Sequence, residues 1–270
     1  MEFLEFTFMQ HALVAGGVIG LLCALVGVFV IHKGMSFMGA GIAHASFGGV
    51  ALGLWLGVHP VLSAVVFCLV VGWIIAWLNW KTELREDTSV GIFFASTMAL
   101  GILVIGLAGG YRQDLFGYMF GSILAVSSTD LWIILAGAGV VMMGLVWYGK
   151  ELLFMIFDPE GAAVAGMPIG FLHFLLTTLI TLTVVISIKV VGIVLVSALL
   201  VTPAATAALL SRRFEVILVL SAIIGVLGTL SGLVLSYYWN TASGATIVAL
   251  VTILFLFAAL FKFIRRYISY

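Results

Sequence analysis

An all-helical bundle that crosses a membrane several times is the fold class that this sequence predicts, from three observations. Of the 270 residues, 64% are hydrophobic and only 8% are charged, and the mean hydropathy is +1.34. One soluble core cannot bury that much apolar surface. The apolar residues also gather in runs of about 20, the length that a helix needs to cross the hydrocarbon layer. Finally, the few basic residues fall almost entirely on one side when these runs are threaded through a membrane.

Nine candidate spans follow from the apolar runs. They lie near residues 12–31, 38–57, 60–80, 89–108, 130–148, 169–188, 192–211, 216–237 and 244–263. Residues 109–129 are apolar in part, and we expect them either to lie outside the membrane or to dip into it without crossing. Together the runs predict a single transmembrane domain over residues 1–270.

The basic residues predict an orientation with the N-terminus outside and the C-terminus in the cytoplasm. In that orientation nine of the eleven lie on the cytoplasmic side: Lys33, Lys81, Arg85, Lys150, Arg212, Arg213, Lys262, Arg265 and Arg266. Only Arg112 and Lys189 lie outside, as the positive-inside rule favours. We therefore expect a multi-pass protein of a prokaryotic plasma or inner membrane, in contact with lipid.

The net charge and the short segments between the spans disfavour other classes of function. The formal net charge is zero and no basic domain is present, so nucleic acid is not an expected partner. The longest polar connections are "KTELREDTS" and "YGKELLFMIFDPEGAAVAGMP", and neither is large enough to bind a nucleotide. We therefore expect no enzyme activity and no bound cofactor on this chain, and its energy must come from another chain or from a gradient.

The second span carries a histidine, His44, beside a seam of small residues. Gly41, Ala45, Gly49, Gly53 and Gly57 recur every four residues, which lets another helix backbone approach closely. Helical geometry places His44 about 60° from Gly41, so the ring faces protein or a cavity and not lipid.

Two interpretations of His44 remain open from the residues alone. The ring could simply bond to a neighbouring helix. Alternatively, an ionisable group inside a membrane marks a translocation path, and imidazole is a common ligand of divalent transition metals. One histidine cannot complete a metal site, but two copies of the chain meeting at a symmetry axis could supply half of one.

Residues 158–168, "DPEGAAVAGMP", predict a short, strongly capped helix on the cytoplasmic side. Asp158 is the expected N-cap, Glu160 lies in the first turn, and Gly166 is the expected C-terminal stop. So short a helix is marginal alone. Its small apolar face, made of Ala162, Ala163, Val164 and Ala165, suits a groove on a cytoplasmic partner, although a well-capped connecting loop is the alternative.

In the seventh span, Pro203 removes a backbone hydrogen bond. Thr202 and Thr206 could satisfy the carbonyls that this frees. The pattern predicts a kinked helix, with a hinge or a pore-lining polar patch as the alternative.

Five segments, in order along nearly the whole chain, resemble the permease subunits of prokaryotic zinc, manganese and iron ABC importers. They read "FMGAGIAHASFGGVALG", "LFGYMFGSILAVSSTDL", "DPEGAAVAGMP", "VVGIVLVSALLVTPAATAALLS" and "SGLVLSYYWNTASGATIVAL". The resemblance implies a homodimer, two ATP-binding subunits in the cytoplasm and an extracytoplasmic metal-binding protein. It also implies that 158–168 is the coupling helix that docks in the ATPase.

One position departs from the family pattern. The family's second span usually has an aspartate four residues before the histidine, and both line the metal path. Here the histidine matches His44, but Ala40 replaces the aspartate. The loss of an oxygen ligand weakens an inference of manganese and favours zinc.

Three alternative functions fit the sequence less well. An ion-gradient carrier usually has a carboxylate in the middle of a span, and none is found there. An intramembrane zinc protease needs HExxH, whereas His44 is followed by "ASFGG". An ABC permease for a metal chelate would be expected to have a roomy path without histidine.

Overall fold

The computed structural model describes residues 7–82, 84–107 and 127–268, and every regular element in these ranges is an α-helix. The helices are α1 (Thr7–Lys33), α2 (Met38–Leu56), α3 (Pro60–Thr82), α4 (Glu86–Leu107), α6 (Ser128–Phe157), α7 (Pro159–Val164), α8 (Ile169–Val191), α9 (Ile193–Leu210), α10 (Phe214–Trp239) and α11 (Ser243–Ile268). The all-helical class is therefore confirmed.

Eight of these helices are long and apolar enough to cross a membrane. Each corresponds to an expected span. The ninth expected span, 192–211, corresponds to α9, which has only 18 residues and an apolar part, Leu195–Leu210, shorter than the others. Most of the expected dip at 109–129 lies outside the described residues. Among the described residues, the nine expected spans are thus matched by eight full-length candidates and one short helix.

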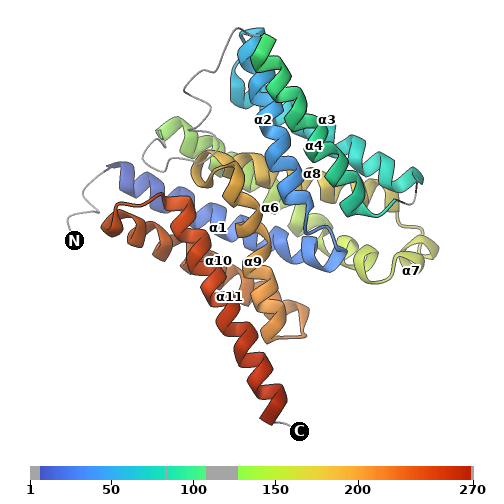
Figure 1. Cartoon of the computed structure of the whole chain (residues 1–270). Helices are drawn as coiled ribbons and strands as arrows, with labels where there is room; N and C mark the ends of the chain where they lie inside the picture. Colours follow the sequence, from blue (N-terminus) through green and yellow to red (C-terminus); the bar gives the residue numbers. More distant parts are fainter. Residues whose placement is uncertain (1–6, 83, 108–126, 269–270) are drawn as a thin grey trace.

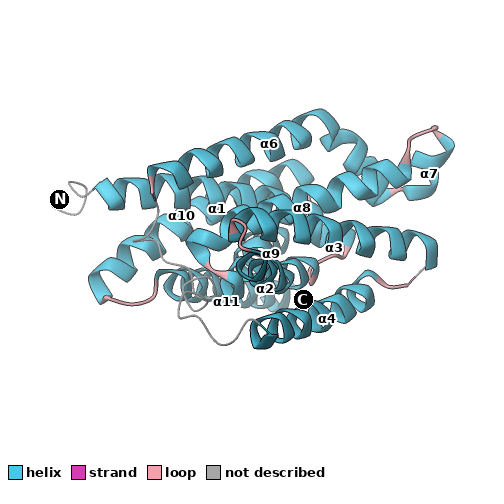
Figure 2. Ribbon diagram, turned by 90° about the horizontal axis from the view of Figure 1, so that it is seen from above, coloured by secondary structure: helices cyan, strands magenta, loops and turns pink. Residues whose placement is uncertain are grey.

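The helices form three neighbouring groups. In Figure 1, α2, α3 and α4 lie together in the upper part, α9, α10 and α11 lie below, and α1, α6 and α8 run between them. Figure 2 shows α2 and α9 almost end-on, while α1, α6 and α8 run across the view. The two outer groups are joined through α8, which packs against helices of both, and through α2, which packs on α9. Side chains of α1 and α8, including Ile19, Leu22, Leu176 and Ile180, are fully buried.

Glycines allow the closest helix crossings of this bundle. A methyl group at Gly20 in α1 would lie 2.6 Å from the carbonyl oxygen of Gly225 in α10, and a methyl group at Gly27 would overlap the carbonyl oxygen of Leu200 in α9. Small residues at such positions let backbones touch, which is the main source of packing between helices in lipid. These crossings fix α1 against α9 and α10.

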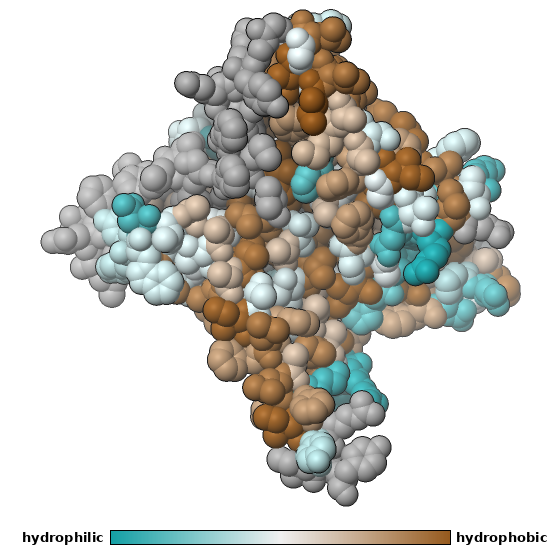
Figure 3. Space-filling view, in the orientation of Figure 1, coloured by the Kyte–Doolittle hydropathy of each residue, from teal (hydrophilic) through white to brown (hydrophobic). Residues whose placement is uncertain are grey.

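The outer surface is largely apolar, as contact with lipid requires. Large hydrophobic side chains are exposed on α3, α6 and α11, among them Val66, Val146 and Phe257. Figure 3 shows brown, hydrophobic surface over the upper helices and over α11, and teal, hydrophilic residues gathered on the right, where α7 lies. The protein is therefore a multi-pass membrane protein in which α7 belongs to a polar end of the bundle.

Candidate functional site

His44 lies in the second turn of α2 and is half-buried. Its ring nitrogen Nδ1 lies 2.9 Å from the carbonyl oxygen of Ala40. Because a carbonyl only accepts, Nδ1 must donate this hydrogen bond and carry the proton. In the neutral ring the lone pair is then on Nε2, the arrangement in which histidine binds a metal through one nitrogen and is oriented through the other.

An aromatic side chain lies next to His44. The His44 ring packs on Phe94 of α4, with the ring centroids 4.4 Å apart and the planes tilted by 50°. No group of three or more His, Cys, Asp or Glu side chains able to hold a metal ion is found among the described residues. Within the described chain, therefore, His44 offers one nitrogen ligand, and further ligands must come from elsewhere.

A second histidine at the end of α1 provides a useful comparison. His32 also donates from Nδ1, to the carbonyl oxygen of Val28 at 2.7 Å. Its ring, however, packs edge-on against Phe157 and Phe214. The helical hydrogen bond alone thus does not mark a metal ligand, which makes His32 a matched control for His44.

The small-residue seam of α2 packs inside the chain, against two neighbouring helices. Gly41 faces Val90 of α4, whereas a methyl group at Gly49 would lie 2.7 Å from the Cα of Ala64 in α3. Gly53 is equally close to α3, and Ala45 is fully buried.

Gly57 has a different role from the other residues of the seam. It is the C-cap of α2, with φ of 70° and no atom within 4 Å of an added methyl group. Gly41 thus lets α2 lie close to α4, which carries Phe94, Gly49 and Gly53 let it lie close to α3, and Gly57 ends the helix.

Within residues 158–168, only Pro159–Val164 form the helix α7, which is shorter than the capping residues suggested. The Asp158 side chain accepts a hydrogen bond from the backbone N–H of Gly161 at 2.8 Å, and the helix ends at Val164. Gly166 follows with φ of 77°, in the left-handed region that favours glycine. Its N–H donates to the carbonyl of Ala163, and the N–H of Met167 donates to that of Ala162, which completes a Schellman motif.

The faces of α7 differ from the expectation at one residue. Ala162 is fully buried within the chain, so it is not part of an outer face. Glu160 and Ala163 are exposed, and Val164 is 90% exposed. An isolated apolar side chain so fully exposed at a polar end of the molecule is available to a partner.

Pro203 lies inside α9 and is buried, and Thr202 is half-buried beside it. The hydroxyl of Thr206 donates to the carbonyl of Thr202 at 2.7 Å. The carbonyl that Pro203 deprives of a partner is that of Leu199, four residues earlier. The expected compensation by Thr206 is therefore wrong, because its hydroxyl serves a different carbonyl.

Sequence reasoning missed a polar cluster at the end of the bundle that carries α7. The sequence patterns singled out none of His173, Asn79 and Glu86. These three residues, from α8, α3 and α4, line one cavity. Because they are far apart in the sequence, no spacing pattern could have joined them, although an asparagine inside an apolar run was a usable signal.

Known proteins match this chain over nearly its whole length. The ABC 3 transport family is matched over residues 5–262. The chain is 37% identical over 261 residues to the manganese transport system membrane protein MntC of Halalkalibacterium halodurans, covering 97% of this chain and 89% of the relative. It is 36% identical over 257 residues to the high-affinity zinc uptake system membrane protein ZnuB of Haemophilus influenzae, covering 95% and 98%.

A solved structure shows the same fold at similar identity. A chain of PsaBC from Streptococcus pneumoniae, in complex with Fab, has a TM-score of 0.84 and 38% sequence identity, and the match covers 95% of this chain and 94% of that one. The resemblance drawn from the sequence is confirmed, and the chain belongs to the ABC 3 transport family, as a membrane permease subunit.

Proposed function

We propose that this chain forms the translocation path of an ATP-driven importer of divalent transition metal ions, with His44 as a ligand along the path. The observation that carries the proposal is the position of His44, an ionisable side chain inside a helix that can span the membrane. Its Nδ1 bond to Ala40 leaves the lone pair on Nε2 for a metal. The names of the relatives, which specify manganese or zinc, support the class of substrate.

Within that class, we favour zinc over manganese. Ala40 supplies no oxygen donor, and its carbonyl is already engaged by His44. Zinc accepts imidazole readily, whereas manganese is held best by oxygen ligands. Relatives named for manganese and for zinc match at nearly the same identity, so the names do not separate the two metals and the local ligand chemistry carries the choice.

We further propose that α7 is the coupling helix that docks on an ATP-binding subunit. Its exposed Val164 and Ala163 provide a small apolar contact, and its two caps hold it in shape. Lys33 and Pro159 of α7 line the cavity that also contains His173, Asn79 and Glu86. Lys81 and Arg85 are next in the sequence to other residues that line it, so basic residues cluster near α7. By the positive-inside rule this cluster supports a cytoplasmic position for α7.

The complete importer would contain a second copy of this chain, two ATP-binding subunits and an extracytoplasmic metal-binding protein. A second copy would bring a second His44 to the path. Two imidazoles can form half of a four-coordinate zinc site. ATP would bind to the partner subunits and not to this chain.

The test compares metal uptake by cells that produce the whole importer with wild-type chain, His44→Ala or His32→Ala. Loss of a metal ligand is expected to lower zinc uptake by roughly tenfold or more. The His32→Ala control removes a histidine with the same helical hydrogen bond and is expected to transport normally. Wild-type uptake by a His44→Ala protein that reaches the membrane in normal amounts would refute the role of His44.

A further inference from the structure

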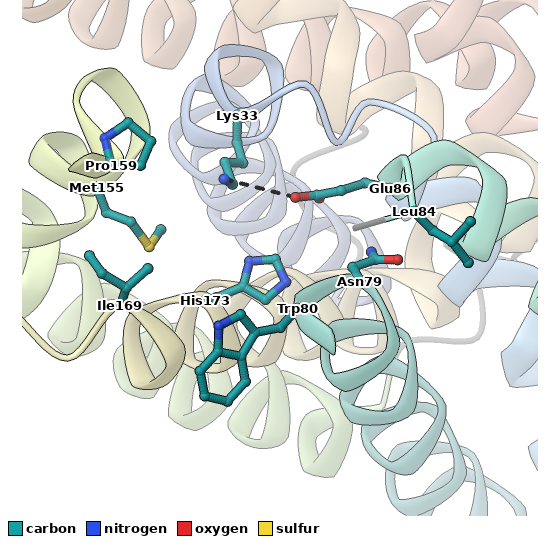
Figure 4. A pocket seen from close by; sticks show the side chains of 9 residues that line it. All are labelled: Lys33, Asn79, Trp80, Leu84, Glu86, Met155, Pro159, Ile169 and His173. Atoms are coloured by element: carbon teal, nitrogen blue, oxygen red, sulfur yellow. Dashed lines mark ion pairs between the residues drawn. The ribbon is translucent and has the colours of Figure 1, made fainter. Parts of the chain in front are cut away.

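A cavity of about 170 Å³ lies at the end of the bundle that carries α7 (Figure 4). Its lining includes Lys33 at the end of α1, Asn79 of α3, Glu86 at the start of α4, Pro159 of α7 and His173 of α8. A space of this size holds several water molecules or a hydrated ion.

Four polar atoms at this cavity have no hydrogen-bond partner within the described ranges. They are His173 Nε2, Glu86 Oε2, and the amide Oδ1 and Nδ2 of Asn79. The His173 and Asn79 side chains belong to residues that are only 8% exposed. Buried polar groups nearly always have partners, so this concentration of unpartnered atoms indicates that something polar occupies the cavity.

The side chains are arranged around a common space. In Figure 4 the ring of His173 lies between Trp80 and the Lys33–Glu86 pair, and Asn79 lies near Glu86. The Lys33 Nζ is 3.9 Å from Glu86 Oε1, a long ion pair that leaves Oε2 unused. A positive charge therefore already sits beside this carboxylate, but it is weakly held.

The available donors select the class of occupant. An imidazole nitrogen, a carboxylate oxygen and an amide oxygen are together a ligand set for zinc or a similar transition metal, with water completing the shell. An anion would be repelled by Glu86. Magnesium and calcium take oxygen ligands and would leave the imidazole unpaired.

We propose that His173, Glu86 and Asn79 form a second metal site, at the α7 end of the permease, which takes the divalent transition metal that passes His44. Both sites border α4, because Phe94, the neighbour of His44, follows Glu86 by eight residues, a helical rise of roughly 12 Å. Lys33 is the competitor, and its ammonium leaves Glu86 when the metal arrives. The identity of the metal as cargo rests on the proposed function; the site itself does not.

The test measures equilibrium binding of radioactive zinc to the purified full-length chain in lipid nanodiscs, in a His44→Ala background. In this parent, zinc is expected to bind at one site per chain. Adding His173→Ala is expected to weaken binding by at least about tenfold. Adding Lys33→Met removes the competing charge and is expected to tighten binding by up to about fivefold. Adding His32→Ala is the control and should change nothing.

The outcomes separate the two proposals. Absence of zinc binding in the parent, as expected if only water fills the cavity, would overturn the second site, and so would a His173→Ala chain that binds like the parent. If His173→Ala does not fold, Lys33→Met decides, and an unchanged affinity counts against the site. If zinc binds as expected but the wild-type importer transports no metal, the second site is supported and only the proposed function is refuted.

Discussion

Restoring the family's acid at position 40 tests the metal path most directly. Ala40 is the third residue of α2, is half-buried, and precedes His44 by one helical turn. Its carbonyl orients the His44 ring. The substitution Ala40→Asp leaves that backbone bond in place and adds a carboxylate on nearly the same face as the imidazole.

The cost of the new charge can be bounded from its position. An aspartate in the middle of a membrane helix costs about 3 kcal/mol. Position 40, however, lies in the first turn, where backbone N–H groups are unpaired and the helix dipole favours an acid by about 0.3–1 kcal/mol. The N-cap, Phe37, makes no side-chain capping bond that would compete. We therefore expect the variant to fold and to reach the membrane.

The substitution adds an oxygen donor, a type of ligand that manganese prefers more strongly than zinc does. We expect the ratio of manganese to zinc uptake to rise by about tenfold, which corresponds to about 1.4 kcal/mol of differential stabilisation. The assay is uptake of radioactive manganese and zinc by cells that produce the whole importer. Ala40→Asn, similar in size but uncharged, is the control. An unchanged ratio in Ala40→Asp, or an equal shift in Ala40→Asn, would refute the reasoning.

Two further predictions concern backbone geometry. Gly166→Val places a β-branched residue at φ of 77° and is expected to cost about 1–2 kcal/mol locally, which weakens association with the ATPase in co-purification, whereas Gly166→Asn tolerates this conformation and should bind. Normal association of the valine variant would count against α7 as the coupling helix. Gly27→Ala pushes a methyl group into a carbonyl of α9 and is expected to cost about 1–3 kcal/mol, measured by thermal unfolding in detergent. Gly91→Ala, where nothing lies within 4 Å, is the matched control, and equal stability of the two variants would contradict the packing.

An element can be predicted from the sequence when the interactions that form it act within one segment of the chain. The spans were found because lipid exposure demands about 20 apolar residues, a signal contained in each segment. Boundaries moved where polar residues continue the helix. For example, α6 extends from the expected 148 to Phe157 and carries Lys150 and Glu151 past the apolar run. The caps of α7 were also readable, because Asp158 and Gly166 act on backbone groups only a few residues away.

In the candidate site, too, some features could be predicted from the sequence and others could not. His44 stood out because an ionisable group in an apolar run is unusual in any membrane helix. Its tautomer was not predictable, since that depends on the carbonyl of Ala40 being within reach of one ring nitrogen. The error at Thr206 arose because a hydroxyl chooses among several nearby carbonyls, a choice that the local geometry makes.

The sequence by itself determined the membrane class, the positions of the helices, the short capped helix and the family. All of these depend on composition and on interactions within a few residues. Only the tertiary structure decided that the α2 seam packs between α3 and α4, that Gly20 meets Gly225, and that Asn79, Glu86 and His173 share a cavity. These pairings join residues up to 205 positions apart. In lipid, where hydrophobicity does not distinguish one helix face from another, they are set by close steric fit between particular side chains, which no single segment contains.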